Sequence, residues 1–132
     1  MHQTSKTISH GQNKLRGIFG PNFTTLPIKV KKNDVKDVLT NGVLKAGTLI
    51  TEDGKKVTST AASGDKAAAT DAYGVVYQDV DFNNSMSADG VENNATEVVP
   101  VFVQGTVYES AVSFSTQKTL EKAALKNIIF IK

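Results

Sequence analysis

The sequence predicts a small β-rich α+β domain, barrel or sandwich-like, with one short C-terminal helix and an extended N-terminal arm. Short runs of β-branched and aromatic residues alternate with turn residues after Pro27. A single helical pattern, TQKTLEKAALK, precedes an apolar C-terminal run. Residues 1–25 are polar and rich in Ser, Thr, Gln, Asn and Gly, so they cannot bury a core of their own. We therefore divide the chain into an arm, residues 1–25, and a β-rich domain, residues 26–132.

Length and composition restrict the class of protein. A chain of 132 residues can bury one core without a disulfide or a metal. A net charge of +2 is not that of a strongly basic nucleic-acid binder, so no nucleic-acid partner is expected. The absence of cysteine excludes disulfides, Cys-ligated metals and thiol nucleophiles. The N-terminus lacks the apolar stretch of a signal peptide, and no long apolar run predicts a membrane span, so no membrane association is expected.

The first half of the domain is predicted from turn chemistry. IKVKK, residues 28–32, predicts the first strand. The Asp-Gly pair at 53–54 predicts a hairpin turn, because Gly supplies the positive φ that such a turn needs. Residues 48–51 and 55–59 should therefore pair antiparallel. Residues 60–72 are small and include a glycine, which favours a loop over a weak helix.

The second half contains the main core strand of the prediction. Residues 73–82 predict one continuous strand, and the polar run 83–97 predicts a long exposed loop. VVPVFVQGTVYESAV, from Val98, is dense in β-branched and aromatic residues. Pro100 and Gly105 place a bulge or a sheet edge within it.

The C-terminal segment combines the helix with a last strand. Ser115 or Thr116 is expected to cap the helix. Helical spacing predicts one apolar face and leaves Glu121 and Lys122 outside it. That face consists of Leu120, Ala123 and Ala124. NIIFIK predicts an apolar strand that must be paired within the domain or an oligomer.

Acidic residues are concentrated near the predicted strand 73–82, where Asp79 and Asp81 resemble the start of a calcium loop. An EF-hand requires Gly at its sixth position and Glu at its twelfth, but these positions hold Asn84 and Gly90. Neighbours on one face of a strand are about 6.6 Å apart, too far to chelate one ion unaided. We therefore predict no metal site and interpret these acids as the solvated side of a strand. In that strand, one face carries Val76, Val80 and Phe82, and the other carries Val75, Tyr77, Asp79 and Asp81.

Motifs for catalysis are missing from the sequence. The two histidines, His2 and His10, lie in the polar arm, where nothing orients them as a general base. Neither nucleotide-binding glycine loops nor a GxSxG elbow occur. The sequence therefore predicts no enzyme, no catalytic residue and no cofactor.

The order of motifs resembles a known family. GVLKAGTLIT, DGKKVT, AYGVVYQDVDFNN, VPVFVQGTVYES and EKAALKNIIFIK follow one another in the chain. This series resembles the capsid decoration and head fibre proteins of tailed bacteriophages, including the lambda-type head decoration protein. The resemblance covers roughly residues 43–132, and the arm and the 83–97 loop have no clear counterpart.

The resemblance implies a non-enzymatic homotrimer on the outer surface of the virion capsid, made in the host cytoplasm. Its partner would be the major capsid protein, and its task would be to stabilise the expanded shell against the pressure of packaged DNA. In lambda-type relatives the arm becomes ordered on the capsid and adds to strands of the shell. The apolar residues that would contact the capsid here are Leu15, Ile18, Phe19, Phe23 and Leu26.

Two other functions stay open at this point. A particle-displayed glycan- or receptor-binding module would use the 83–97 loop, with calcium as an aid. A small hydrolase would use the acid cluster, which consists of Asp79, Asp81, Asp89, Glu92 and Glu97. A melting experiment with EDTA and calcium tests the ion, and a pocket that unites Asp79 with Asp81 would favour the hydrolase.

Overall fold

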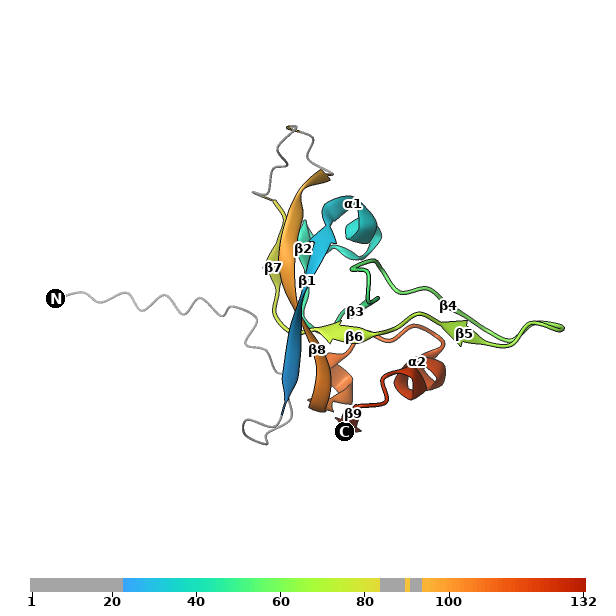
Figure 1. Cartoon of the computed structure of the whole chain (residues 1–132). Coiled ribbons are helices and arrows are strands. Elements are labelled where there is room, and N and C mark those ends of the chain that lie inside the picture. Colours follow the sequence, from blue (N-terminus) through green and yellow to red (C-terminus); the bar gives the residue numbers. More distant parts are fainter. Residues whose placement is uncertain (1–22, 84–89, 91–93) are drawn as a thin grey trace.

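A computed structural model describes residues 23–83, 90 and 94–132 (Figure 1). These residues form a β-rich, sandwich-like domain with nine strands and two short α-helices. The described strands do not close into a barrel, so the barrel alternative is wrong. A helix of four residues follows the first strand and was not predicted, because its residues show no helical spacing of apolar side chains. Neither helix in this part of the chain is long and apolar enough to cross a membrane.

The elements follow one another in the order shown in Figure 1. Single-turn 3₁₀ helices, Lys36–Val38 and Glu109–Ala111, follow α1 and β8. The strands and α-helices are β1 (Thr24–Lys31), α1 (Lys32–Val35), β2 (Val43–Leu44), β3 (Leu49–Ile50), β4 (Ser59–Thr60), β5 (Ala69–Thr70), β6 (Gly74–Val76), β7 (Val80–Asp81), β8 (Thr96–Tyr108), α2 (Lys118–Ala124) and β9 (Ile128–Ile131).

The main sheet is organised around β8, a strand of 13 residues. Its strand order is β1-β8-β6-β3, with antiparallel pairing, and β9 pairs with β8 in parallel. Thr24 lies opposite Gln104 whereas Thr25 lies opposite Phe102, so Val103 is the extra residue of a bulge. The prediction of a main core strand is confirmed, and of the predicted alternatives, a bulge or a sheet edge at Pro100 and Gly105, the structure has a bulge at Val103.

Two apolar cores lie on opposite faces of the central sheet. Adjacent residues send one side chain to each core, because successive side chains of a strand point to opposite faces. In β8, Phe102 enters the first core and Val101 the second; β3 and β6 divide their adjacent residues in the same way. The buried residues of the first core are Leu49, Val75, Phe102, Val107, Val112, Leu125 and Ile128. Those of the second are Val30, Val35, Leu44, Ile50, Val76, Phe82, Val99 and Val101.

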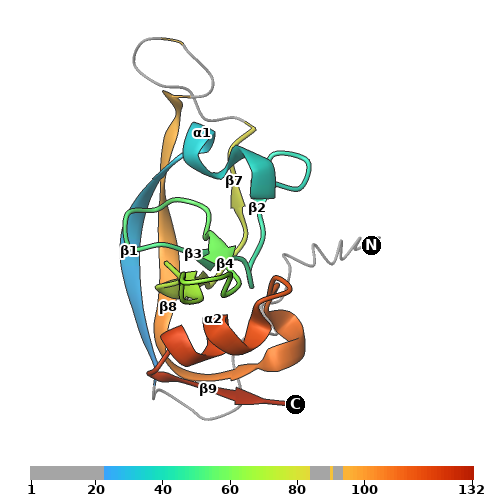
Figure 2. The same cartoon turned by 90° about the vertical axis from the view of Figure 1, so that its right-hand side faces the viewer.

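The two cores occupy different ends of the molecule. Figure 2 shows α1, β2 and β7 near one end of β8, and α2 with β9 at the other. Leu125 and Ile128 come from the α2–β9 end, whereas Val35 and Leu44 come from the α1–β2 end. β8 therefore contributes buried side chains to both packed regions and connects them.

The predicted continuous strand over residues 73–82 is wrong. β6 ends at Val76 and β7 begins at Val80, because β7 leaves the main sheet to pair with β2. The predicted division into an apolar and a polar face fails as well, since Val75 and Val76 are both fully buried. Side chains on both faces of this strand are buried, one face in each core. The strand therefore lacks the alternation of apolar and polar residues that is typical of a strand with one core face.

Residues 60–72 form most of a projecting β-hairpin instead of the predicted loop. β4 pairs with β5, and the ribbon extends away from the rest of the domain (Figure 1). A further bridge joins Ser63 and Lys66 near the tip. Residues 61–69 are all exposed and include no large apolar side chain, so the hairpin shows no alternating pattern that would predict it from the sequence.

The Asp-Gly hairpin turn is confirmed, although its strands are shorter than predicted. Gly54 has φ +81° and donates its N–H to the carbonyl of Thr51 at 3.1 Å. Ladder pairing across this turn is confined to a bridge between Ile50 and Lys56. A side chain on Gly54 would place its Cβ 2.5 Å from the Lys29 carbonyl oxygen, so the turn lies directly against β1.

Helix α2 buries a face other than the predicted one. Glu121 is 1% exposed and the C-cap residue Leu125 is 3% exposed, whereas Ala123 is exposed. The predicted cap at Ser115 or Thr116 is wrong, because the helix begins at Lys118 and its N-cap is Gln117, without a side-chain capping hydrogen bond. Ser115 Oγ accepts the Gln117 N–H at 3.1 Å in the turn that precedes the helix. The predicted C-terminal strand is confirmed as β9, paired within the domain to β8.

Candidate functional site

The chain enters the described structure at an anchored aromatic residue. The Phe23 ring stacks against Tyr77 and Phe102, with centroids 5.5 Å and 5.9 Å away. Tyr77 and Phe102 also stack on each other at 6.0 Å, which makes a cluster of three rings at the margin of the first core. Such ring contacts contribute roughly 0.5–1.5 kcal/mol each beyond buried area. Phe23 is therefore a fixed point from which residues 1–22 depart.

The five predicted capsid-contacting residues are divided by this anchor. Leu15, Ile18 and Phe19 lie outside the described residues. Phe23 is part of the domain, and Leu26 lies in β1 with 39% of its surface exposed. β1 starts at Thr24, so the expected boundary between residues 25 and 26 falls inside a strand. No apolar run surrounds Phe23, so its place in the domain could not be predicted from the sequence pattern.

The outer edge of β1 is restricted by a proline. Pro27 lies opposite Pro100 in the antiparallel ladder, and the Pro100 carbonyl accepts the Tyr77 N–H at 2.8 Å on the side of β6. The Pro27–Pro100 pair is therefore a non-hydrogen-bonded pair, and Pro27 directs its carbonyl to the outer edge. Proline has no N–H to offer a further strand at this position.

The turn at Gly54 restricts the same edge further along. Lys29 is two residues beyond Pro27, so its carbonyl also points outward, and Gly54 lies directly against it. A further strand is therefore blocked from pairing with β1 beyond Pro27. Before Pro27, Thr25 is the β1 residue whose main-chain N–H and carbonyl face outward. The part of the β1 edge that can still pair with another strand is its beginning, where the arm joins the domain.

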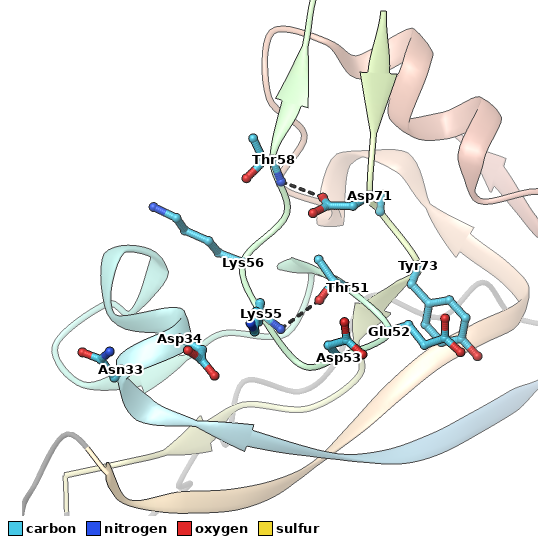
Figure 3. Close-up of a pocket in the computed structure, with 11 residues that line it drawn as sticks. Asn33, Asp34, Thr51, Glu52, Asp53, Lys55, Lys56, Thr58, Asp71 and Tyr73 are labelled. Carbon is cyan, nitrogen blue, oxygen red and sulfur yellow. Dashed lines mark hydrogen bonds between the residues drawn. The ribbon is translucent and has the colours of Figure 1, made fainter.

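A shallow polar pocket of about 680 Å³ lies between α1, the Gly54 turn and the base of the projecting hairpin (Figure 3). Its polar side chains hold the surrounding main chain: Thr51 Oγ1 accepts the Lys55 N–H at 2.9 Å, and Asp71 accepts the Thr58 N–H at 2.7 Å. Lys56 points out of the pocket and pairs with Asp37, and this hydrogen bond lowers the pKa of Asp37. The lining residues are Asn33, Asp34, Thr51, Glu52, Asp53, Lys55, Lys56, Thr58, Asp71, Ala72 and Tyr73.

The acids singled out in the sequence have separate structural partners. Asp79 accepts the Ala46 N–H at 2.7 Å and lies 3.4 Å from Lys45 Nζ, and these contacts hold the β6–β7 connection against the β2–β3 connection. Asp81 accepts the Asn83 N–H at 2.8 Å within a local turn. Within the described ranges, no three His, Asp or Glu side chains are grouped to hold a metal ion. Asp89 and Glu92 lie outside those ranges.

Comparison with protein-family models, curated proteins and solved structures finds no match to this chain. The functional argument therefore depends on its own residues. They offer an anchored aromatic residue, Phe23, a partly blocked edge at β1 and a polar pocket whose side chains mainly bind neighbouring main chain.

Proposed function

We propose that this chain is a non-enzymatic capsid decoration protein of a tailed bacteriophage. It binds the outer surface of the assembled head through its N-terminal arm and stabilises the shell. The major capsid protein is its partner, and the virion surface is its location. The observation that carries the proposal is the anchoring of Phe23 on Tyr77 and Phe102, immediately before an edge strand.

The fixed position of Phe23 favours a binding role for the arm that precedes it. Leu15, Ile18 and Phe19 precede Phe23 by eight, five and four residues, so they stay within a short tether of a rigid surface. A short tether raises the effective concentration of these apolar side chains at the shell once one contact has formed. In a homotrimer, which the resemblance to decoration proteins implies, three such arms would bind with avidity.

Deletion of residues 1–22 tests the proposal. The truncated chain keeps Phe23 and all of β1, so it should unfold at the same temperature as the full chain. Its binding to expanded shells of the major capsid protein, measured by co-sedimentation, should fall to background.

A shorter truncation serves as the control. Deletion of residues 1–12 keeps Leu15, Ile18 and Phe19, and it should leave binding intact. The deletion ends at residue 22 because removal of residues 1–25 would also remove the ring stack and the first residues of β1. Full occupancy of shells by the chain that lacks residues 1–22 would refute the role of the arm.

A further inference from the structure

The edges of the main sheet are protected unequally. At β1, Pro27 and the Gly54 turn restrict strand addition, as described above. The far edge of β3 is covered, because Thr51 donates to the Lys55 carbonyl and the Gly47 carbonyl accepts the Ser113 N–H. β9 pairs with β8 on one side, and no described residue pairs with its other side. Figure 2 shows β9 at the lower margin of the molecule, below α2.

The main chain of β9 offers hydrogen-bonding groups at this open edge. The Asn127 carbonyl accepts the Gly105 N–H at 3.1 Å, so Asn127 faces β8, and by alternation Ile129 and Ile131 face it too. Phe130 therefore directs both its N–H and its carbonyl away from β8. No proline interrupts β9, so the edge is intact for a further strand.

The side chains of β9 are apolar on both faces. Ile128 is buried and Phe130 packs edge-on against Phe114, with centroids 5.5 Å apart, which fixes the strand to the domain. Ile129, on the opposite face, is 64% exposed, the largest exposed fraction among the large apolar residues of the described chain. Proteins rarely leave an apolar edge strand uncovered, because such an edge promotes aggregation.

Positive charge flanks the strand. Lys126 precedes β9 and Lys132 follows it, and both side chains are exposed. Neither forms an ion pair with another described residue, in contrast to Lys118 and Lys122, which both pair with Glu109. Two antiparallel copies of β9 would place Lys126 of one chain near Lys132 of the other, so charge repulsion disfavours pairing of the strand with itself.

We propose that the open edge of β9 receives an extended segment of the shell protein. This segment has apolar residues at alternate positions, which cover Ile129 and Ile131, and acidic residues at its ends, which pair with Lys126 and Lys132. It forms main-chain hydrogen bonds with Phe130, as in other strand-addition complexes. The inference rests on the proposed function and adds a second contact, on the body of the domain, to that of the arm.

Two substitutions at β9 test this contact on expanded shells of the major capsid protein. Ile129→Lys replaces an exposed side chain, so the fold should persist while the dissociation constant rises by at least about tenfold. Replacement of Phe130 by its α-hydroxy analogue turns one amide into an ester. It removes the outward N–H and should weaken binding about threefold to tenfold. It also makes the Ile129 carbonyl, which faces β8, a weaker acceptor, and the melting temperature of the variant measures that effect separately.

Matched controls separate the contact from general effects of charge. Val98→Lys makes the same kind of change at an exposed residue of β8, 56% exposed, and should leave binding unchanged. Lys126→Glu with Lys132→Glu should weaken binding, and the difference from the unchanged chain should shrink as salt is raised. Each variant is compared with the unchanged chain for its melting temperature and its sedimentation in the absence of shells.

The outcomes distinguish this inference from the proposed function. If the unchanged chain binds shells and both β9 variants bind equally well, the β9 contact is refuted and the decoration function stands. If the unchanged chain does not bind shells, both are refuted. If Ile129→Lys abolishes self-association in the absence of shells, the occupant of the edge is a second copy of the chain and the shell segment is refuted.

Discussion

Glu121 is a buried carboxylate whose removal should show how the projecting hairpin is fixed to the domain. Its Oε2 accepts hydrogen bonds from the hydroxyls of Ser59 and Ser115, the latter at 2.7 Å, and its Oε1 accepts the Ser115 N–H at 2.9 Å. Ser59 belongs to β4 and is 62 residues away in sequence. Glu121→Leu keeps the side chain close in volume but removes all three acceptor contacts.

The loss of stability follows from the donors that this substitution leaves. Ser59 retains a partner in the Thr70 hydroxyl at 2.7 Å, so its hydroxyl is not left without a hydrogen bond. The Ser115 N–H loses its bond to a carboxylate, and a hydrogen bond to a charged group contributes roughly 1.5–3 kcal/mol. With the other two bonds at about 1 kcal/mol each, and partial compensation from apolar burial, we expect a net loss of about 3 kcal/mol. For a domain of this size that lowers the melting temperature by about 12 °C.

Thermal unfolding followed by circular dichroism measures this loss. Glu121→Gln keeps one acceptor oxygen and should lose only about 1 kcal/mol. Thr119→Leu introduces the same side chain on the exposed face of α2 and serves as the matched control, with a change within about 0.5 kcal/mol. The reasoning is refuted if Glu121→Leu is as stable as the unchanged chain, because Glu121 would then not be the buried acceptor described here.

Three further predictions concern the turn, the pH dependence and metal ions. Gly54→Ala should destabilise the domain by about 2–4 kcal/mol in urea unfolding, because φ is +81° and the new Cβ would meet the Lys29 carbonyl; a neutral effect would contradict the packing of the turn on β1. Hydrogen bonds from Lys122 and Lys118 lower the pKa of Glu109 in the folded state, so its contribution to stability is present above the usual glutamate pKa and is lost as the pH falls through the lowered value. Glu109→Gln should therefore be less stable than the unchanged chain at neutral pH and approach it in acid; a pH-independent difference would contradict this ion pair. EDTA and calcium should leave the melting temperature unchanged, whereas a calcium-dependent rise would revive the ion-assisted binding module.

Local chemistry allowed the sequence to predict the elements whose formation depends on a few adjacent residues. The Asp-Gly turn and the apolar strand β9 are of this kind. The continuous strand over residues 73–82 was predicted from alternation toward one core. It was wrong because the sheet has a core on each face, so that Val75 and Val76 are both buried.

The remaining errors come from contacts between distant residues. Helical spacing predicted that Glu121 lies outside the buried face. The side chain is buried because Ser59 donates a hydrogen bond to it, and Ser59 comes from a segment with no apolar pattern. The anchoring of Phe23 depends in the same way on Tyr77 and Phe102, 54 and 79 residues further along the chain. A candidate arm was visible in the composition, whereas the position of its anchor depends on tertiary contacts.

The projecting hairpin of β4 and β5 has a practical consequence for the use of this protein as a carrier of foreign peptides. Residues 61–69 are exposed, and a side chain on Gly64 would have nothing within 4 Å. Extra residues in an exposed loop cost little free energy, since the entropy of closing it grows only slowly with its length. Sequence inserted at Gly64 would lie outside both cores and away from the three rings at Phe23. The tip of the hairpin is thus a natural place to display an epitope.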